Sequence, residues 1–407
     1  MSVEPDNSWL HSLAGRASRM QASEIRELLK LLDQPDIISF AGGIPEPTLF
    51  PLDETRRIAG ELLGNASSAV QALQYAPSEG HLPLRRWIVG HMAKDGIQCG
   101  VENILLTTGS QQALDLLAKL LVDPGDRIAV TAPTYLGALQ AFNAYEPAYA
   151  TLDPACPDML DKGLTLAYAV PDFANPTGET VSLARRRALV TRLRDLRVPF
   201  IEDAAYRSIR FEGEPVASCL AIDCELAGGI ERTITAYCGT FSKTLSPGLR
   251  VGWICASTAL IQKLVLAKQA GDLHSPPLTQ MIAERLASTG FDAQVARNIE
   301  TYRNRRDAML KALEAHMPAG VRWTRPEGGM FVWLDTNDDI DGARLLQQAL
   351  REERIAFVPG KAFFADGSGA STIRLNFSMN SEAVIGEGIA RLARLLTRAP
   401  GSGRSAA

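Results

Sequence analysis

Lys243 lies in the segment 239–253, GTFSKTLSPGLRVGW, between the apolar runs 233–237 and 251–255. Apolar, β-branched runs of this length are typical of buried strands, so we expect the lysine in a loop at a strand end. Surroundings of apolar and hydroxyl side chains, with Arg250 nearby, disfavour the ammonium form and make the amine a better nucleophile. Such an amine can hold an aldehyde as a Schiff base; the alternative is an ordinary solvated lysine.

This segment resembles the cofactor-lysine segment of fold-type I aminotransferases, in which Ser-Lys is followed by an arginine seven residues on. The resemblance implies that Lys243 holds pyridoxal 5'-phosphate and that Arg250 binds its phosphate. It also implies a reaction in two halves with ping-pong kinetics. In the first half the cofactor takes up the amino group as pyridoxamine 5'-phosphate, and in the second a 2-oxo acid receives it. The lysine moves the proton between the substrate's Cα and the cofactor.

Several residues match positions around the cofactor ring in this family. Asp203 follows the apolar run 198–202, and a carboxylate beside the ring nitrogen keeps the pyridine protonated and able to accept electrons. Tyr206, three residues on, and Asn175, in an Asn-Pro-Thr-Gly turn, match residues that bond the ring's phenolic oxygen. Tyr135 matches the residue that stacks on the ring. With the lysine, Asp203 and Tyr206 make up the expected catalytic set, although an isolated Asp203 is equally suited to capping a helix.

A dianionic phosphate needs several donors, and a helix start with a nearby cation suits it. The residues that match the family's phosphate ligands are Thr240, Ser242, Arg250, and Ser110 with the N–H of Gln111. Tyr75, in the loop LQYAPSEG, matches a tyrosine that reaches the phosphate and the substrate of the neighbouring subunit. It implies a homodimer with shared active sites, an argument that fails if Tyr75 is a plain loop aromatic.

The α-carboxylate of an amino acid is best recognised by arginine, whose planar fork can bind both oxygens. Arg374 lies in the apolar run 372–377 and matches the family's carboxylate-binding arginine, and Asn175 is expected beside it. Gly43 matches a backbone that approaches the substrate. Arg26, on an expected helix over residues 23–32, matches an arginine that pairs with an acidic side chain of the substrate, or it lies on a solvated helix face.

Strands and helices alternate from about residue 103 to 255, which favours a mostly parallel sheet with helices on both faces. Ligands of such a sheet gather at the carboxyl ends of its strands, where the candidate residues fall. The expected fold class is α/β, the aspartate aminotransferase-like fold of pyridoxal-phosphate-dependent transferases, with a smaller α+β domain. We expect an N-terminal arm over 1–50 that caps the site and belongs to the small domain, a large cofactor-binding domain over 51–290, a small domain over 291–400, and a disordered tail over 401–407. In the small domain we expect a long helix from 291 to about 316 and strands over 330–334, 355–358 and 372–377.

Bulk properties narrow the classes of partner. With 407 residues, 46% of them hydrophobic, and a net charge of -4, the chain can bury a large core and has no general attraction for nucleic acid or acidic membranes. The histidines form no metal-binding pattern, and the six cysteines form no CxxC pair, which is typical of a reducing compartment. The N-terminal segment MSVEPDNSWLHS has no secretory pattern, and no apolar run has membrane-spanning length. We therefore expect a cytoplasmic protein without metal, membrane or nucleic-acid partners.

The resemblance is strongest to the 2-aminoadipate (LysN-like) and kynurenine/aminoadipate aminotransferases, on segments such as FAGGIPEPTLFP, TTGSQQALDL and RPEGGMFVW. It implies transfer from 2-aminoadipate, glutamate, an aromatic or a long aliphatic amino acid to an acceptor such as 2-oxoglutarate. Another reaction of the same cofactor, such as β-elimination, racemisation or oxidation, is the alternative. A cofactor-binding transcription regulator is a further alternative, which the few residues before the matching region disfavour.

Overall fold

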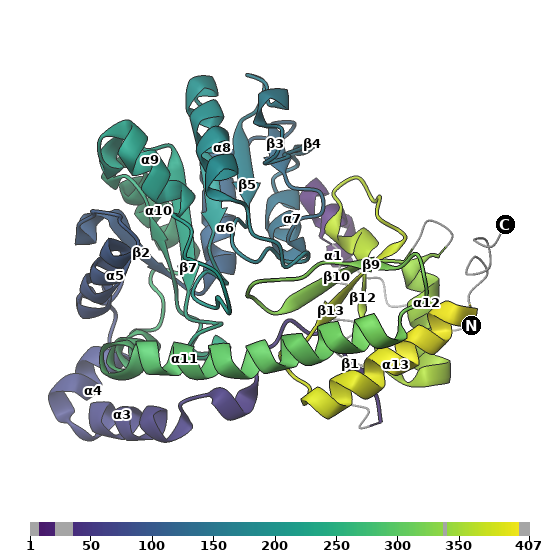
Figure 1. Ribbon diagram of the computed structural model, residues 1–407. Helices are drawn as coiled ribbons and strands as arrows, with labels where there is room; N and C mark the ends of the chain where they lie inside the picture. The colour runs from purple at the N-terminus through teal and green to yellow at the C-terminus, as the bar shows by residue number, and fades with distance from the viewer. Residues whose placement is uncertain (1–7, 21–35, 337–339, 399–407) are drawn as a thin grey trace.

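The computed structural model describes residues 8–20, 36–336 and 340–398. Within these ranges two larger sheets lie side by side, and the helix α11 (Pro277–His316) runs along the lower edge of both (Figure 1). The helix expected over 23–32, with Arg26, and the tail over 401–407 lie outside the described residues.

The larger sheet has seven strands in the order β2-β8-β7-β6-β5-β3-β4. Only β8 runs antiparallel to its neighbours, so the predicted mostly parallel sheet is confirmed. The strands are β2 (Ile104–Thr107), β3 (Arg127–Val130), β4 (Ala148–Thr151), β5 (Leu166–Ala169), β6 (Phe200–Asp203), β7 (Thr235–Thr240) and β8 (Gly252–Cys255).

Helices cover both faces of this sheet, because alternate strand residues are apolar on each side. Leu105, Tyr168 and Ile201 point into one core, which also contains residues of α6 (Ser110–Leu121), α7 (Leu136–Asn143) and α10 (Thr258–Gly271). On the opposite face, strand residues pack against three helices in two further apolar clusters. These helices are α5 (Leu82–Lys94), α8 (Leu183–Leu196) and α9 (Cys219–Ala227).

The second sheet is antiparallel, in the order β12-β13-β10-β9, and a separate parallel pair joins β1 to β11. Helix α13 (Glu382–Arg398) packs along α11 beneath this part of the molecule (Figure 1). The strands are β1 (Ile38–Ser39), β9 (Arg322–Trp323), β10 (Phe331–Asp335), β11 (Ile355–Ala356), β12 (Val358–Pro359) and β13 (Thr372–Asn376), and α12 (Gly342–Gln348) follows β10.

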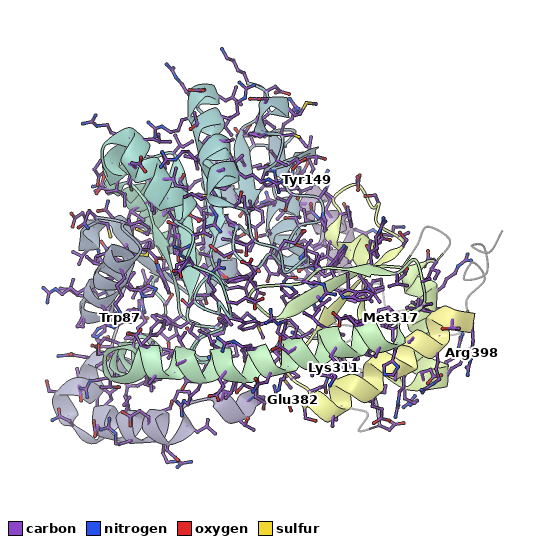
Figure 2. All side chains as sticks on the ribbon, viewed as in Figure 1. Trp87, Tyr149, Lys311, Met317, Glu382 and Arg398 are labelled. Carbon is purple, nitrogen blue, oxygen red and sulfur yellow. The ribbon has the colours of Figure 1, made fainter. Side chains whose placement is uncertain are left out.

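Helix α11 joins the two parts of the molecule. It contacts α3 (Leu52–Gly64), α4 (Ala66–Leu73) and α5 near its start and α13 further along. Trp87 of α5, labelled in Figure 2, packs edge-on against Phe291 of α11, with ring centroids 5.0 Å apart. The helix departs from helical geometry at Gly290, at the boundary expected between the two domains.

Three element predictions were incomplete. The helix expected from residue 291 to about 316 is the part of α11 that follows the kink at Gly290, but the helical segment from Pro277 up to that kink was not predicted. Proline is well suited to its first turn because the missing N–H has no partner there. The expected single strand over 355–358 is two strands that pair with different sheets. Strand β4, at the edge of the large sheet, was not predicted, because AYAT is short and mostly small.

Two further observations concern membrane-spanning helices and the cysteines. The helices of the described residues include none long and apolar enough to cross a membrane. Within the same residues, Cys219, Cys238 and Cys255 are buried free thiols and Cys156 is exposed.

Candidate active site

A cavity of about 410 Å³ opens at the carboxyl ends of β5, β6 and β7. Ten of the predicted residues line it: Ser110, Gln111, Tyr135, Asn175, Asp203, Tyr206, Thr240, Ser242, Lys243 and Arg250. They come from loops that are far apart in the sequence, and the parallel strands bring those loops to one edge of the sheet.

Lys243 lies three residues past the end of β7, so its amine reaches the cavity. Its Nζ donates a hydrogen bond of 2.9 Å to the carbonyl oxygen of Gly43. Burial, together with repulsion from Arg374 and Arg250, lowers the pKa of Lys243 to about 8, although Asp203 opposes the shift. The amine is therefore deprotonated far more readily than an exposed lysine and can act as nucleophile or base near neutral pH.

Asp203 ends β6 and is buried at the floor of the cavity. Its Oδ2 accepts a 2.9 Å hydrogen bond from the hydroxyl of Tyr168, and its Oδ1 accepts one of 3.3 Å from the N–H of Ala205. Burial raises the pKa of Asp203 to about 6, against the opposing effects of these donors and of Lys243. A buried carboxylate in this state favours a cationic partner, such as a protonated ring nitrogen.

Tyr168 was not predicted as a site residue. It lies within β5, fully buried, and a tyrosine in an apolar strand is normally a core residue. The sequence signal is weak: a hydroxyl inside an otherwise apolar run needs a buried partner. Strand β5 pairs with β6, with Tyr168 opposite Ile201, which places the hydroxyl within reach of Asp203.

Asn175 follows β5 in a turn with a cis Asn175–Pro176 peptide and contacts two other predicted residues. Its Nδ2 lies 3.5 Å from the hydroxyl of Tyr206, and its Oδ1 accepts a 2.8 Å hydrogen bond from Nη1 of Arg374. Burial raises the pKa of Tyr206 well above its usual value, so this hydroxyl stays protonated. Asn175 thus joins the cavity of the large sheet to the arginine of β13.

Arg374 is 1% exposed and does not itself line the cavity. Its guanidinium lies over the rings of Phe331 and Phe363, at 4.3 and 5.0 Å from their centroids, and Nη2 donates to the carbonyl oxygen of Ala41. No acceptor for its Nε is found among the described residues, and burial lowers its pKa to about 10. A buried cation without a carboxylate partner is costly, which favours an anionic ligand beside it.

The start of α6 and the loop after β7 form one wall of the cavity. Gly109, at φ +79°, precedes the helix, and a Cβ there would lie 2.6 Å from Nη2 of Arg250. A Cβ on Gly252 would lie 2.9 Å from the backbone nitrogen of Ser110. The two glycines therefore let the arginine and the helix start approach each other closely.

Hydroxyls and one cation complete this wall. Thr240 Oγ1 lies 2.9 Å from Ser242 Oγ, and Arg250 is exposed and donates to the carbonyl oxygen of Thr108 at 3.2 Å. Free helix N–H groups, hydroxyls and a guanidinium are the donors that a phosphate dianion prefers. With Asp203 and Lys243 on the same cavity, the residues present fit pyridoxal phosphate.

The remaining predicted residues differ in how close they lie to the cavity. Tyr135 lines the cavity just before α7, and burial raises its pKa to about 12. Gly43 is outside the lining and reaches it through its carbonyl oxygen. Tyr75 is 79% exposed, away from the cavity of its own chain, with its ring edge-on to His274 at 5.7 Å. Arg26 lies outside the described residues.

Comparison with known proteins identifies relatives over nearly the whole chain. The profile of the family "Aminotransferase class I and II" matches residues 43–392. Aromatic-amino-acid aminotransferase 1 of Thermococcus litoralis is 42% identical, over 94% of this chain and 93% of its own length. The 2-aminoadipate transaminase of Thermus thermophilus is also 42% identical, over 96% of this chain and 97% of its own length.

Solved structures agree with the sequence relatives. LysN, the alpha-aminoadipate aminotransferase of Thermus thermophilus complexed with N-(5'-phosphopyridoxyl)-L-leucine, has a TM-score of 0.87 at 40% identity, and the match covers 96% of this chain and 98% of that one. The fold is therefore that of pyridoxal-phosphate-dependent aminotransferases, as predicted. The chain belongs to the aminotransferase class I and II family and is a pyridoxal-phosphate-dependent transaminase.

Proposed function

We propose that this transaminase acts on amino acids with acidic, aromatic or long aliphatic side chains, among them 2-aminoadipate and glutamate, with 2-oxoglutarate as acceptor. The observation that carries the proposal is the buried Arg374 beside Asn175, which suits the α-carboxylate common to all these donors. A relative named for aromatic amino acids supports the aromatic donors, and a relative named for 2-aminoadipate supports the acidic donors. Arg26 is the proposed partner of an acidic side chain.

The chain's own residues divide the work. When bound, pyridoxal phosphate supplies the electron sink that stabilises the carbanion left when the substrate's Cα loses its proton. Lys243 takes that proton at Nζ, which its lowered pKa permits near neutral pH. Asp203 holds the proton on the ring nitrogen through a charged hydrogen bond. Arg374 orients the substrate through its carboxylate.

Hydrogen-bond donors fix the remaining groups. Asn175 and Tyr206 are the proposed donors to the ring's phenolic oxygen, and Tyr135 is proposed to cover one ring face. The phosphate is assigned to Thr240, Ser242, Arg250, and Ser110 with the N–H of Gln111. The glycines at 109 and 252, which allow this wall to close up, support the assignment.

A homodimer with shared sites is part of the proposal. Exposed apolar side chains gather on and after α3 and α4: Leu63, Val70, Leu73 and Tyr75. A contiguous group of exposed apolar side chains is a common mark of a surface that contacts another protein chain. The proposed partner surface brings Tyr75 to the neighbouring active site. We also propose that the protein is cytoplasmic and that its large domain spans 51–290 and its small domain 291–400.

The donor range can be tested by mixing purified enzyme with glutamate, 2-aminoadipate, leucine, phenylalanine or kynurenine in turn. We expect the absorption band of the aldehyde form of the cofactor to convert to that of the amine form, and 2-oxoglutarate to restore it. Arg26→Gln should slow conversion by the two dicarboxylates and leave leucine unaffected. Ammonia release without an oxo acid would instead indicate elimination, and an unchanged band with every donor would contradict the proposed range.

A further inference from the structure

A buried lysine outside the cavity is not explained by the site described above. Lys268 lies near the end of α10, and its side chain is fully buried. Burying a lysine is costly unless each of its N–H groups finds an acceptor. The partners of this ammonium group therefore indicate why it is retained.

Nζ of Lys268 donates to acceptors on two other segments. It lies 2.8 Å from Oε1 of Gln112, 2.8 and 2.9 Å from the carboxylate oxygens of Asp272, and 2.9 Å from Oγ of Ser275. Gln112 belongs to the first turn of α6, and Asp272 and Ser275 lie in the loop between α10 and α11. One cation thus fixes the start of α6 against this loop.

The same cluster supports the backbone of the cavity wall. Oε1 of Gln112 also accepts from the backbone N–H of Thr108 at 2.8 Å, and Oγ1 of Thr108 lies 2.8 Å from Oγ of Ser275. The carbonyl oxygen of Thr108 in turn accepts from Arg250. Only Gly109 separates Thr108 from Ser110. The cluster thus supports both the helix start and the guanidinium assigned to the phosphate.

Charge adds to this mechanical role. Burial alone raises the pKa of the Asp272 carboxyl, but hydrogen bonds from Lys268 and Gln112 outweigh it, so the net effect is a lowered pKa and an ionised Asp272. The side chain of Asp272 is 31% exposed and so is only partly screened by water. If Lys268 were absent, an uncompensated negative charge would lie behind the wall that receives the phosphate.

We infer that Lys268 is a positioning residue for the cofactor's phosphate: through Gln112 and Thr108 it holds the start of α6 and Arg250 in place, and it neutralises Asp272 behind them. It touches neither cofactor nor substrate. The inference rests on the assignment of Ser110, Gln111 and Arg250 to the phosphate in the proposed function.

The test compares dissociation constants of pyridoxal phosphate and of pyridoxal, which lacks the phosphate, for the apoenzyme. The ratio of the pyridoxal constant to the pyridoxal phosphate constant measures the contribution of the phosphate and is unaffected by a general loosening of the ring site. We expect Lys268→Met to shrink this ratio about tenfold, because a buried charged hydrogen-bond donor is lost. Lys263→Met, an exposed lysine on the same helix, is the matched control and should leave the ratio unchanged.

Gln112→Met provides a second variant, which keeps the ion pair and the contact between the Thr108 and Ser275 hydroxyls but breaks the link to the backbone N–H of Thr108. We expect the ratio to fall about threefold. If Lys268→Met does not fold, this variant decides. An unchanged ratio, or an equal loss of affinity for both ligands, would overturn the inference. Arg250→Ala separates the two claims. If it lowers the ratio and the Lys268 and Gln112 variants do not, the inference alone is wrong. If Arg250→Ala leaves the ratio unchanged, the phosphate assignment fails and the inference with it.

Discussion

The hydroxyl of Tyr168 provides a specific test of how the sheet sets the charge of the active site. Tyr168→Phe removes one oxygen atom, and with it the 2.9 Å hydrogen bond to Oδ2 of Asp203. Both side chains are buried, so water cannot replace the donor freely. Among the described residues, the carboxylate then keeps the longer bond from the N–H of Ala205 and the attraction of Lys243.

The magnitude follows from the strength of such a bond. A hydrogen bond to a charged group contributes roughly 1.5 to 3 kcal/mol, and 1.36 kcal/mol corresponds to about one pKa unit. Losing the Tyr168 donor should therefore raise the pKa of Asp203 in the apoenzyme by about 1 to 2 units from its value of about 6. The ionised form, which we propose pairs with the cofactor's protonated ring nitrogen, then needs a higher pH.

The assay is the dissociation constant of pyridoxal phosphate between pH 5 and 9, measured for both proteins. Affinity should weaken as Asp203 becomes protonated, below about pH 6 in the wild type and already below about pH 7 to 8 in the variant. The ratio of the two constants should be near one at pH 9 and about tenfold at pH 6. The cofactor's own phosphate also titrates in this range, but it affects both proteins equally.

A control variant removes a similar hydroxyl elsewhere. Tyr149 lies on β4 at the edge of the same sheet (Figure 2), and its hydroxyl donates to Oδ1 of Asn143 at 2.7 Å. Tyr149→Phe should leave the pH profile of cofactor binding unchanged. If the Tyr168→Phe to wild-type ratio does not vary with pH, the Tyr168 hydroxyl does not set the pKa of Asp203.

Two other substitutions test individual residues. Because burial raises the pKa of Asp203, its ionised form destabilises the apoenzyme above about pH 6, and this cost disappears below the pKa of the unfolded state near 3.8. Asp203→Asn should therefore abolish amino-group transfer. In denaturant unfolding it should stabilise the apoenzyme by up to about 3 kcal/mol at pH 8 and by almost nothing at pH 4. Equal effects at both pH values would contradict this. Arg374→Met should lower kcat/KM about a thousandfold, since the substrate carboxylate loses a buried charged partner, while the dissociation constant of the cofactor changes by less than about threefold; a loss in kcat/KM below about tenfold would argue against Arg374 as carboxylate ligand.

The residues around the cavity could be predicted from the sequence because they follow strands. Asn175, Asp203 and Lys243 each come at or just after an apolar run, and parallel strands bring their carboxyl ends to one edge. Their side-chain types then restrict the chemistry. Resemblance to a known family assigned the roles, which spacing alone leaves open.

The roles of residues inside strands and helices could not be predicted in this way. Tyr168 is one residue in a buried strand, and its partner depends on β5 lying next to β6, which local sequence does not state. In the sequence Lys268 is one of several polar residues on a mostly apolar helix. Its contact with Gln112 joins positions 156 residues apart. The split of the run 355–358 between two sheets depends on β1, which comes from the distant N-terminal part of the chain.

The central claim is that Lys243 holds the cofactor and moves the substrate's proton. Reduction of the holoenzyme with borohydride, digestion and mass spectrometry would test the first part directly, because reduction makes the bond between amine and cofactor permanent. We expect the added mass of the cofactor on the peptide containing Lys243, and we expect Lys243→Ala to abolish both the label and turnover. A label on another lysine, such as Lys268, or full turnover in the Lys243→Ala variant would contradict it.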